Sequence, residues 1–364
     1  MKTWLSSIRG AATAAVLTLA LAACGQKPVE EAAPARTEFT IGWTIYAGWM
    51  PWPYAEQAGI VDKWEEKYGV TINVVQINDY VESLNQYTAA AIDGVTTTTM
   101  DALTIPAAGG RDSTVVIAGD YSNGNDGIIL KGGSSLADIR GRGVNLVEFS
   151  VSHYLLARGL ESVNLAPTDI RTINTSDADI VAAFGAADTQ AVVAWNPQLS
   201  EIAAMPRAVP VFDSSKIPGE ILDTLVVSTE ALASNPNLGR ALAGIWYETM
   251  ALMNAQTPEG AAARAAMGEL SGTDQAGYEA QLVTTYMYYE PSAALTFLRS
   301  PELVAATDRV RQFSFANGLF GEGATSVDAI GITFPGGQTL GSADNVKLRF
   351  DDSYTAAAAA GELN

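Results

Sequence analysis

The chain has 364 residues, 48% of them hydrophobic, and carries 21 Lys and Arg against 40 Asp and Glu, a formal net charge of −19. Such an acidic surface disfavours nucleic acid, whose phosphates need Lys and Arg, and it concentrates cations instead. One histidine and one cysteine in the whole sequence exclude an internal disulfide and argue against a histidine-based nucleophile or a zinc site. We therefore expect no cofactor, no metal and no enzymatic activity.

The first 23 residues have the parts of an export signal. Lys2 and Arg9 form a positive start, and Ala11–Ala23 is an apolar run too short to span a bilayer. The run ends in Leu-Ala-Ala-Cys at Cys24, the sole cysteine, which resembles a bacterial lipobox and implies cleavage before Cys24 and lipid attachment to it. A chance match in an alanine-rich leader is the alternative. Residues 24–38 are polar and are expected to be a tether, so we expect an extracytoplasmic, lipid-anchored protein.

Strand patterns alternate with helix patterns between residue 39 and about residue 227. Helices are expected over residues 54–68, 79–94 and 150–164, and from Ser176, which has the spacing of a capping pair with Asp179. The expected strands cover residues 38–43, 71–77, 95–100, 114–122, 127–131, 143–148, 169–175, 191–195, 208–212 and 222–228. This alternation predicts parallel βαβ units and therefore an α/β fold.

Helical patterns predominate after residue 228. Residues 346–350 are expected to form one more strand, and the alanine tract Ala356–Ala360 carries no prediction. The two α/β sets could be sequential domains. One set could instead be inserted into the other, with crossovers near residues 120–128 and 222–229, which would create a cleft between two lobes. Periodicity alone does not choose between these layouts.

The stretch Trp43–Tyr54, WTIYAGWMPWPY, is rich in aromatic residues. Gly48, Pro51 and Pro53 disfavour one continuous helix there, so most of the rings are expected on the loop between the first strand and the first helix. Loops at the carboxyl ends of strands are where open α/β sheets bind ligands. The rings are therefore candidates for a binding site.

Five segments in order resemble the solute-binding proteins of ATP-driven (ABC) importers for nitrate, taurine, sulfonates and thiamine precursors. The segments are GWTIYAGWMPWPYAEQAGIVDKWEEKYGVTINVVQI, TTTTMDALTIPAAGG, GDYSNGNDGIILKG, VNLVEFSVSHYLLARGLESVNL and AAFGAADTQAVVAWNP. They are most similar to the subgroup found beside urea (guanidine) carboxylase. The resemblance implies a two-lobed periplasmic-binding-protein-like fold with a ligand cleft and a C-terminal helical extension. It further implies lobes at residues 39–124 with 225–364 and at 125–224, and permease and ATPase partners.

Carboxylates and rings gather at the expected strand ends, without any Lys, Arg or His over residues 43–54, 95–106, 119–130 and 193–198. An oxyanion would lack a positive partner there, whereas a small cation suits both groups. Guanidinium is planar, charged and weakly hydrated enough to stack on rings. The expected ligand residues are Trp43, Tyr46, Trp49 and Trp52 as an aromatic cage, Asp79, Asp101, Asp126 and Glu148 as acceptors, and Trp195 from the other lobe.

Several of these residues also have ordinary structural explanations. Trp43 at a strand end fits a core position, and Asp101 and Glu148 precede helical turns, where a carboxylate can be an N-cap. Asp120 could order the crossover loop. The alternative ligands are urea, a quaternary ammonium or a sulfonate. A glycosidase with paired carboxylates is a more distant alternative.

Overall fold

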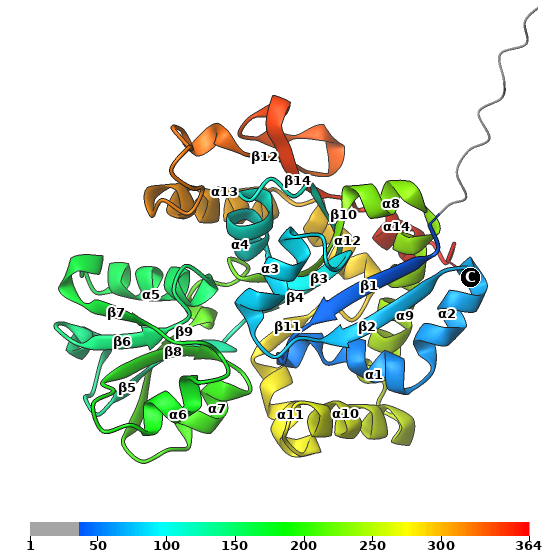
Figure 1. Ribbon diagram of the computed structural model, residues 1–364. Helices are drawn as coiled ribbons and strands as arrows, with labels where there is room; N and C mark the ends of the chain where they lie inside the picture. Colours follow the sequence, from blue (N-terminus) through cyan, green and yellow to red (C-terminus); the bar gives the residue numbers. More distant parts are fainter. Residues whose placement is uncertain (1–35, 364) are drawn as a thin grey trace, which may run out of the picture. The chain divides into compact units, whose positions relative to one another are not determined.

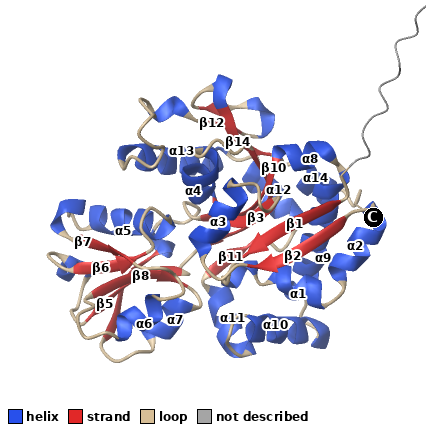
Figure 2. Cartoon of the chain, in the orientation of Figure 1, coloured by secondary structure: helices blue, strands red, loops and turns tan. Residues whose placement is uncertain are grey.

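The computed structural model describes residues 36–363, and Figures 1 and 2 show its helices and strands. The expected signal segment, most of the tether and Cys24 lie outside the described residues. The strands are β1 (Glu38–Trp43), β2 (Thr71–Gln76), β3 (Gly94–Thr98), β4 (Ser113–Ser122), β5 (Asp126–Lys131), β6 (Gly143–Leu146), β7 (Arg171–Asn174), β8 (Ala191–Trp195), β9 (Ala208–Asp213), β10 (Leu222–Ser228), β11 (Thr285–Met287), β12 (Gly331–Thr333), β13 (Thr339–Leu340) and β14 (Val346–Phe350). The helices are α1 (Pro51–Gln57), α2 (Ile60–Tyr68), α3 (Tyr80–Thr88), α4 (Thr99–Ala102), α5 (Val151–Ser162), α6 (Ile180–Gly185), α7 (Gln198–Ala203), α8 (Thr229–Ser234), α9 (Asn237–Asn254), α10 (Pro258–Leu270), α11 (Gln275–Val283), α12 (Pro291–Leu298), α13 (Pro301–Ala316) and α14 (Ser353–Ala359).

The first sheet takes its strands from two separate parts of the chain. Its order is β13-β12-β14-β4-β10-β3-β1-β2, and β11 pairs with β4. Strand β1 is parallel to β2 and β3, whereas β10 is antiparallel to both β3 and β4. This reversal places the amino end of β10 beside the carboxyl ends of β3 and β4. In a parallel sheet the carboxyl ends of the strands carry the ligand residues. Here the first residues of β10 lie beside those ends.

The second sheet has the order β7-β6-β8-β5-β9 and is covered on both faces. Ile128 and Leu130 of β5 pack with Leu155 of α5, while Ile129 packs on the other side with Ile180 and Ile202 of α6 and α7. This is the alternation expected of a strand buried on both faces. Figure 1 shows α5 on one side of this sheet and α6 and α7 on the other.

The chain crosses from the first sheet to the second between Ser122 and Asp126 and returns between Asp213 and Leu222. The two crossovers are hydrogen-bonded together, because the Ser122 and Ser214 hydroxyls lie 2.6 Å apart. The two-lobed α/β fold predicted from the sequence is confirmed. The residue boundaries of the lobes stay a prediction, since contacts join residues 35–364 into one compact unit.

Three helices differ from their predicted extents. The helix expected over residues 54–68 is two helices, α1 and α2, because Gly59 adopts a left-handed φ of 70° between them. The helix expected over residues 79–94 ends at Thr88, and Ala90 has a positive φ of 61°. Helix α6 begins at Ile180 instead of Ser176, because the Ser176 hydroxyl donates to the Asp179 carboxylate (3.0 Å) and does not cap a helix.

The C-terminal part combines helices with strands of the first sheet. Strand β14 pairs with β4 and with β12, and it covers the predicted strand 346–350. The alanine tract that carried no prediction belongs to α14. Helix α13 begins after the N-cap Ser300, and its Val310 packs in the core of the second lobe. Among residues 36–363, no helix has the length and apolar character needed to cross a membrane.

Candidate functional site

A small pocket lies between residues of the two lobes. The first sheet and its loops contribute Tyr46, Trp49, Tyr80, Thr98 and Asp223, and the remaining lining residues are Asp126, Val151, Trp195 and Ile221. We call this the acidic pocket. The space open to a water-sized molecule is only about 10 Å³, far below the ~300–1,000 Å³ of sites for drug-sized ligands. The pocket is thus almost closed in this structure, and only a very small solute suits it.

The topology of the sheets brings these residues together. Tyr46 and Trp49 follow the carboxyl end of β1, Tyr80 follows β2, and Thr98 ends β3. Asp223 stands near the start of the reversed strand β10, where it is paired with Thr98 and with Asp120 on β4. On the second sheet Asp126 and Trp195 are direct cross-strand partners. Residues distant in sequence therefore meet at one place.

Aromatic rings form continuous walls of the acidic pocket. The rings of Tyr46 and Trp49 are 4.9 Å apart at their centroids, and those of Trp49 and Tyr80 are stacked at 5.7 Å. Trp195 meets Tyr80 edge-on at 5.6 Å. Because Trp195 comes from the second lobe, the ring cluster includes side chains of both lobes. Such rings offer faces to a flat solute or to a cation.

Two carboxylates line the acidic pocket and two more lie directly behind its tyrosines. Asp126 and Asp223 are 2% and 3% exposed, and Asp101 and Asp120 are fully buried. The Tyr80 hydroxyl donates to Asp101 (2.8 Å), and the Tyr46 hydroxyl donates to Asp120 (3.1 Å). One carboxylate oxygen each of Asp101, Asp120 and Asp223 has no hydrogen-bond partner among the described residues. Buried acceptors without partners are uncommon and call for a ligand or a proton.

Burial makes these carboxylates hard to ionise in the empty pocket. Desolvation raises the pKa of Asp101 to about 6 against the hydrogen bonds from Tyr80 and Thr98. Desolvation, together with the charge of Asp101, raises the pKa of Asp126 to about 7. Desolvation raises the pKa of Asp120 to about 7, and desolvation together with the charge of Asp120 raises the pKa of Asp223 well above its usual value. A nearby positive charge would lower these raised pKa values and favour the ionised carboxylates.

No basic side chain supplies that charge. The residues that line the acidic pocket include no Lys, Arg or His, and none of the four carboxylates forms an ion pair within residues 36–363. The described residues also contain no cluster of His, Cys, Asp and Glu suited to a metal ion. The acidic pocket thus offers carboxylates and aromatic ring faces to a ligand, without a basic side chain among its lining residues.

Of the nine ligand residues expected from the sequence, Tyr46, Trp49, Asp126 and Trp195 line the acidic pocket and Asp101 lies directly behind it. The other four lie elsewhere. Trp43 is buried in the first core, and Trp52 packs against Trp246 at 5.5 Å. Asp79 is the N-cap of α3, accepting from the Glu82 amide at 2.8 Å. Glu148 accepts a hydrogen bond from the Thr172 hydroxyl.

The expected set lacks five residues that line the acidic pocket, namely Tyr80, Thr98, Val151, Ile221 and Asp223. Tyr80 directly follows Asp79, and only the side chain of Tyr80 lines the acidic pocket. Asp120, which lies behind Tyr46, is one of the carboxylates at the expected strand ends, but a role in ordering the crossover loop kept it out of the expected set. The expected site residues follow strands, whereas Asp223 lies at the start of one. A carboxylate inside the otherwise apolar run LDTLVVS is the signal that could have identified it.

Neither a protein-family model nor a curated protein matches the chain. Solved structures do resemble it. The alkanesulfonate-binding protein SsuA from Xanthomonas axonopodis pv. citri, bound to MOPS, has a TM-score of 0.66 and 18% identity, over 80% of this chain and 96% of that one. The aliphatic sulphonate-binding protein SsuA from Escherichia coli gives 0.64 and 20%, over 79% and 95%. The nitrate-binding protein NrtA from Synechocystis PCC 6803 gives 0.55 and 14%, over 90% and 99%. The chain therefore has the fold of periplasmic binding proteins.

Proposed function

We propose that this protein captures guanidinium in the acidic pocket and delivers it to the permease and ATPase of an ABC importer. The observation that carries the proposal is a set of four buried carboxylates beside four aromatic rings, with no basic side chain lining the pocket. A cation in the pocket would pair with Asp126 and Asp223 and restore their ionised forms. The ring faces would attract it by ~0.5–2 kcal/mol each.

Guanidinium suits this set better than other small solutes. Its planar N–H groups can donate to carboxylates in pairs, and its flat face can stack on Trp49 or Tyr80. A quaternary ammonium has no N–H to donate to Asp126 and Asp223. Sulfonate and nitrate, the ligands named for the structural neighbours, are anions and would meet carboxylates without a positive partner.

Urea is the second candidate, and one observation favours it. The Trp49 indole N–H and the Asn125 amide N–H₂ have no hydrogen-bond partner among the described residues. A urea carbonyl could accept from such donors. If the carboxyl groups were protonated, urea would also avoid the unfavourable burial of charge. The pH dependence of binding separates the two ligands, because urea would prefer the protonated pocket and guanidinium the ionised one.

Isothermal titration calorimetry on the purified protein at pH 8 tests the ligand. We expect guanidinium to bind at millimolar concentration or below, while urea, taurine and nitrate bind at least tenfold more weakly. Sodium chloride at equal ionic strength is the control for non-specific cation binding to this acidic protein. Tight binding of urea, taurine or nitrate without binding of guanidinium would overturn the cation proposal.

The import role includes a membrane anchor and a two-lobed delivery mechanism. We propose that Cys24 carries the lipid and that residues 39–124 with 225–364 form one lobe and 125–224 the other. Changing Cys24→Ser should move the protein from the membrane fraction to the extracytoplasmic fluid, while the affinity for guanidinium stays unchanged. Membrane fractionation and calorimetry on the same preparation check both parts. A Cys24→Ser protein that still sediments with membranes would exclude this anchor.

A further inference from the structure

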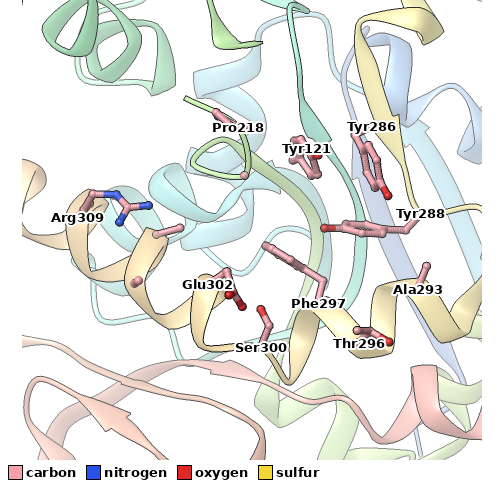
Figure 3. Close-up of a pocket in the computed structure, with 13 residues that line it drawn as sticks. Tyr121, Pro218, Tyr286, Tyr288, Ala293, Thr296, Phe297, Ser300, Glu302 and Arg309 are labelled. Atoms are coloured by element: carbon pink, nitrogen blue, oxygen red, sulfur yellow. The ribbon is translucent and has the colours of Figure 1, made fainter. Parts of the chain in front are cut away.

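A second and larger groove lies on the other side of strand β4 from the acidic pocket. Side chains alternate along a strand, so that Asp120 points toward Tyr46 of the acidic pocket while Tyr121 lines this groove. The groove has about 620 Å³ of space open to a water-sized molecule, and its walls come from β4, β11, α12, α13 and the crossover at Pro218 (Figure 3). We call it the tyrosine groove.

One wall of the tyrosine groove is a ladder of rings. The rings of Tyr121 and Tyr286 are stacked at 4.6 Å, Tyr286 meets Tyr288 at 5.6 Å, and Tyr288 stacks on Phe297 at 5.4 Å. Tyr286 is half exposed. The ladder is a rigid apolar surface, because each ring is held by the next one. An apolar or aromatic group of a ligand can pack against it.

The Tyr288 hydroxyl is an unused donor in this wall. Tyr288 is only 4% exposed, yet its hydroxyl makes no hydrogen bond to another described residue. Figure 3 shows the hydroxyl directed into the groove, between Tyr121 and Phe297. The Tyr288 amide donates to the Gly119 carbonyl at 2.9 Å, which fixes its position beside β4. The oxygen itself is open to the groove and not sealed in the core, so it is free to donate to a ligand acceptor.

Helix α13 adds two opposite charges to the lining of the groove. Glu302 and Arg309 both line it and are seven residues apart, with the small side chains of Ala305 and Ala306 between them. Seven residues correspond to two helical turns, or ~10 Å. Glu302 forms no ion pair with a described residue. Arg309 approaches Glu220 through Nε (3.2 Å), and its two terminal nitrogens make no hydrogen bond to a described residue.

We propose that the tyrosine groove is a second binding site, for an elongated zwitterion with an apolar centre, of the class of short unblocked peptides. The ammonium group would pair with Glu302 and the carboxylate with Arg309. A peptide carbonyl would accept from Tyr288, and a central aromatic side chain would pack on Phe297 and Tyr121. An extended chain covers ~3.3–3.6 Å per residue, so about three residues match the ~10 Å between the charged groups. A zwitterion has no net charge, so the acidic surface does not repel it.

Isothermal titration calorimetry with the tripeptide Ala-Phe-Ala on the full-length protein tests this site. We expect one-to-one binding that weakens about 10- to 100-fold in Glu302→Gln and in Arg309→Gln, and about tenfold in Tyr288→Phe, because each change removes one polar contact. The N-acetylated and C-amidated tripeptide, which lacks both charges, should bind at least tenfold more weakly. Free phenylalanine, which is too short to reach both charges, should also bind more weakly.

Matched variants separate this site from surface charge and from the acidic pocket. Glu230 occupies the same position after a serine N-cap in α8 as Glu302 does in α13, so Glu230→Gln should leave tripeptide binding unchanged. Asp126→Asn and saturating guanidinium should also leave it unchanged. Circular dichroism would verify that each variant is folded. Absence of tripeptide binding at millimolar concentration, displacement by guanidinium, or full affinity in both Glu302→Gln and Arg309→Gln would overturn the proposal.

Discussion

At the scale of single residues, the buried carboxylates of the acidic pocket lower the stability of the ligand-free protein, because no positive side chain that the structure describes is paired with them. The pKa of each of the four carboxylates is raised, and none of them has a positive partner among the described residues. A buried, unpaired carboxylate destabilises the folded state, whereas the same carboxylate beside a bound cation does not. The residues that weaken the empty protein are thus the ones that would hold the ligand.

Asp126→Asn should reduce guanidinium affinity by one to two orders of magnitude. A charge-assisted hydrogen bond is worth ~1.5–3 kcal/mol, and ~1.4 kcal/mol is tenfold in affinity. At pH 8 the ligand-free variant should be at least as stable as the parent, because a buried charge is removed. Calorimetry gives the affinity, and urea unfolding gives the stability. Asp188→Asn, a change at an exposed carboxylate, is the control; equal losses in both variants would reject a specific contact.

Gly48→Ala should damage the acidic pocket through Asp120. A Cβ at Gly48 would overlap the Asp120 carboxylate and stand 2.7 Å from the Tyr46 ring. Overpacking of this kind costs ~1–3 kcal/mol, and the displaced carboxylate should also lower the affinity for guanidinium. Gly185 has no atom within 4 Å of such a Cβ, so Gly185→Ala should change neither property. Thermal unfolding and calorimetry on the two variants measure the differences in stability and in guanidinium affinity. Equal guanidinium affinity in the two variants would show that Asp120 does not contribute to binding.

At the scale of elements, the start of α3 separates a structural carboxylate from the binding site. Asp79 caps the helix, and Tyr80, the next residue, lines the acidic pocket. Two neighbouring residues thus have different roles. The same principle applies to β4, where Asp120 accepts a hydrogen bond from Tyr46 while Tyr121 lines the tyrosine groove. Neighbouring residues of one strand or one helix start can therefore have different surroundings and different roles.

Asp79→Ala should lower the free energy of unfolding by ~1 kcal/mol, the usual cost of losing an N-cap. Asp79→Asn keeps an oxygen that can accept from the Glu82 amide, so it should retain most of the stability. Both variants should bind guanidinium within threefold of the parent protein. Chemical denaturation and calorimetry check the two expectations. A large loss of affinity in the stable Asn variant would return Asp79 to the set of ligand residues.

At the scale of the whole molecule, the raised pKa values make both stability and binding depend on pH. The affected carboxylates bind more protons in the folded protein than in the unfolded chain, whose carboxylates titrate near pH 4. Stability therefore falls as pH rises from about 4 to above 7. His153, whose pKa is lowered by burial, contributes with the opposite sign. The four carboxylates of the pocket outnumber it, so the net trend follows them.

We expect the ligand-free protein to melt at a higher temperature at pH 5 than at pH 8. Guanidinium at a low millimolar concentration should raise the melting temperature more at pH 8, because the ionised pocket binds the cation. Differential scanning fluorimetry in buffers of equal ionic strength measures both effects. If guanidinium stabilised the protein equally at the two pH values, the carboxylates would not be its partners.

The sequence by itself determined the α/β class, because alternating strand and helix patterns depend on the local spacing of apolar residues. The two lobes were implied by the resemblance to solute-binding proteins, since periodicity did not choose between the possible layouts. It also placed Tyr46, Trp49, Asp126 and Trp195 among the ligand candidates, since loops at strand ends carry sites in such sheets. Only the tertiary structure decided which strand-end residues face the acidic pocket. The Trp52 side chain packs against Trp246 in the core, and Asp223 lines the acidic pocket because β10 runs antiparallel to β3. Strand order and register depend on contacts between residues far apart in sequence, which local patterns do not record.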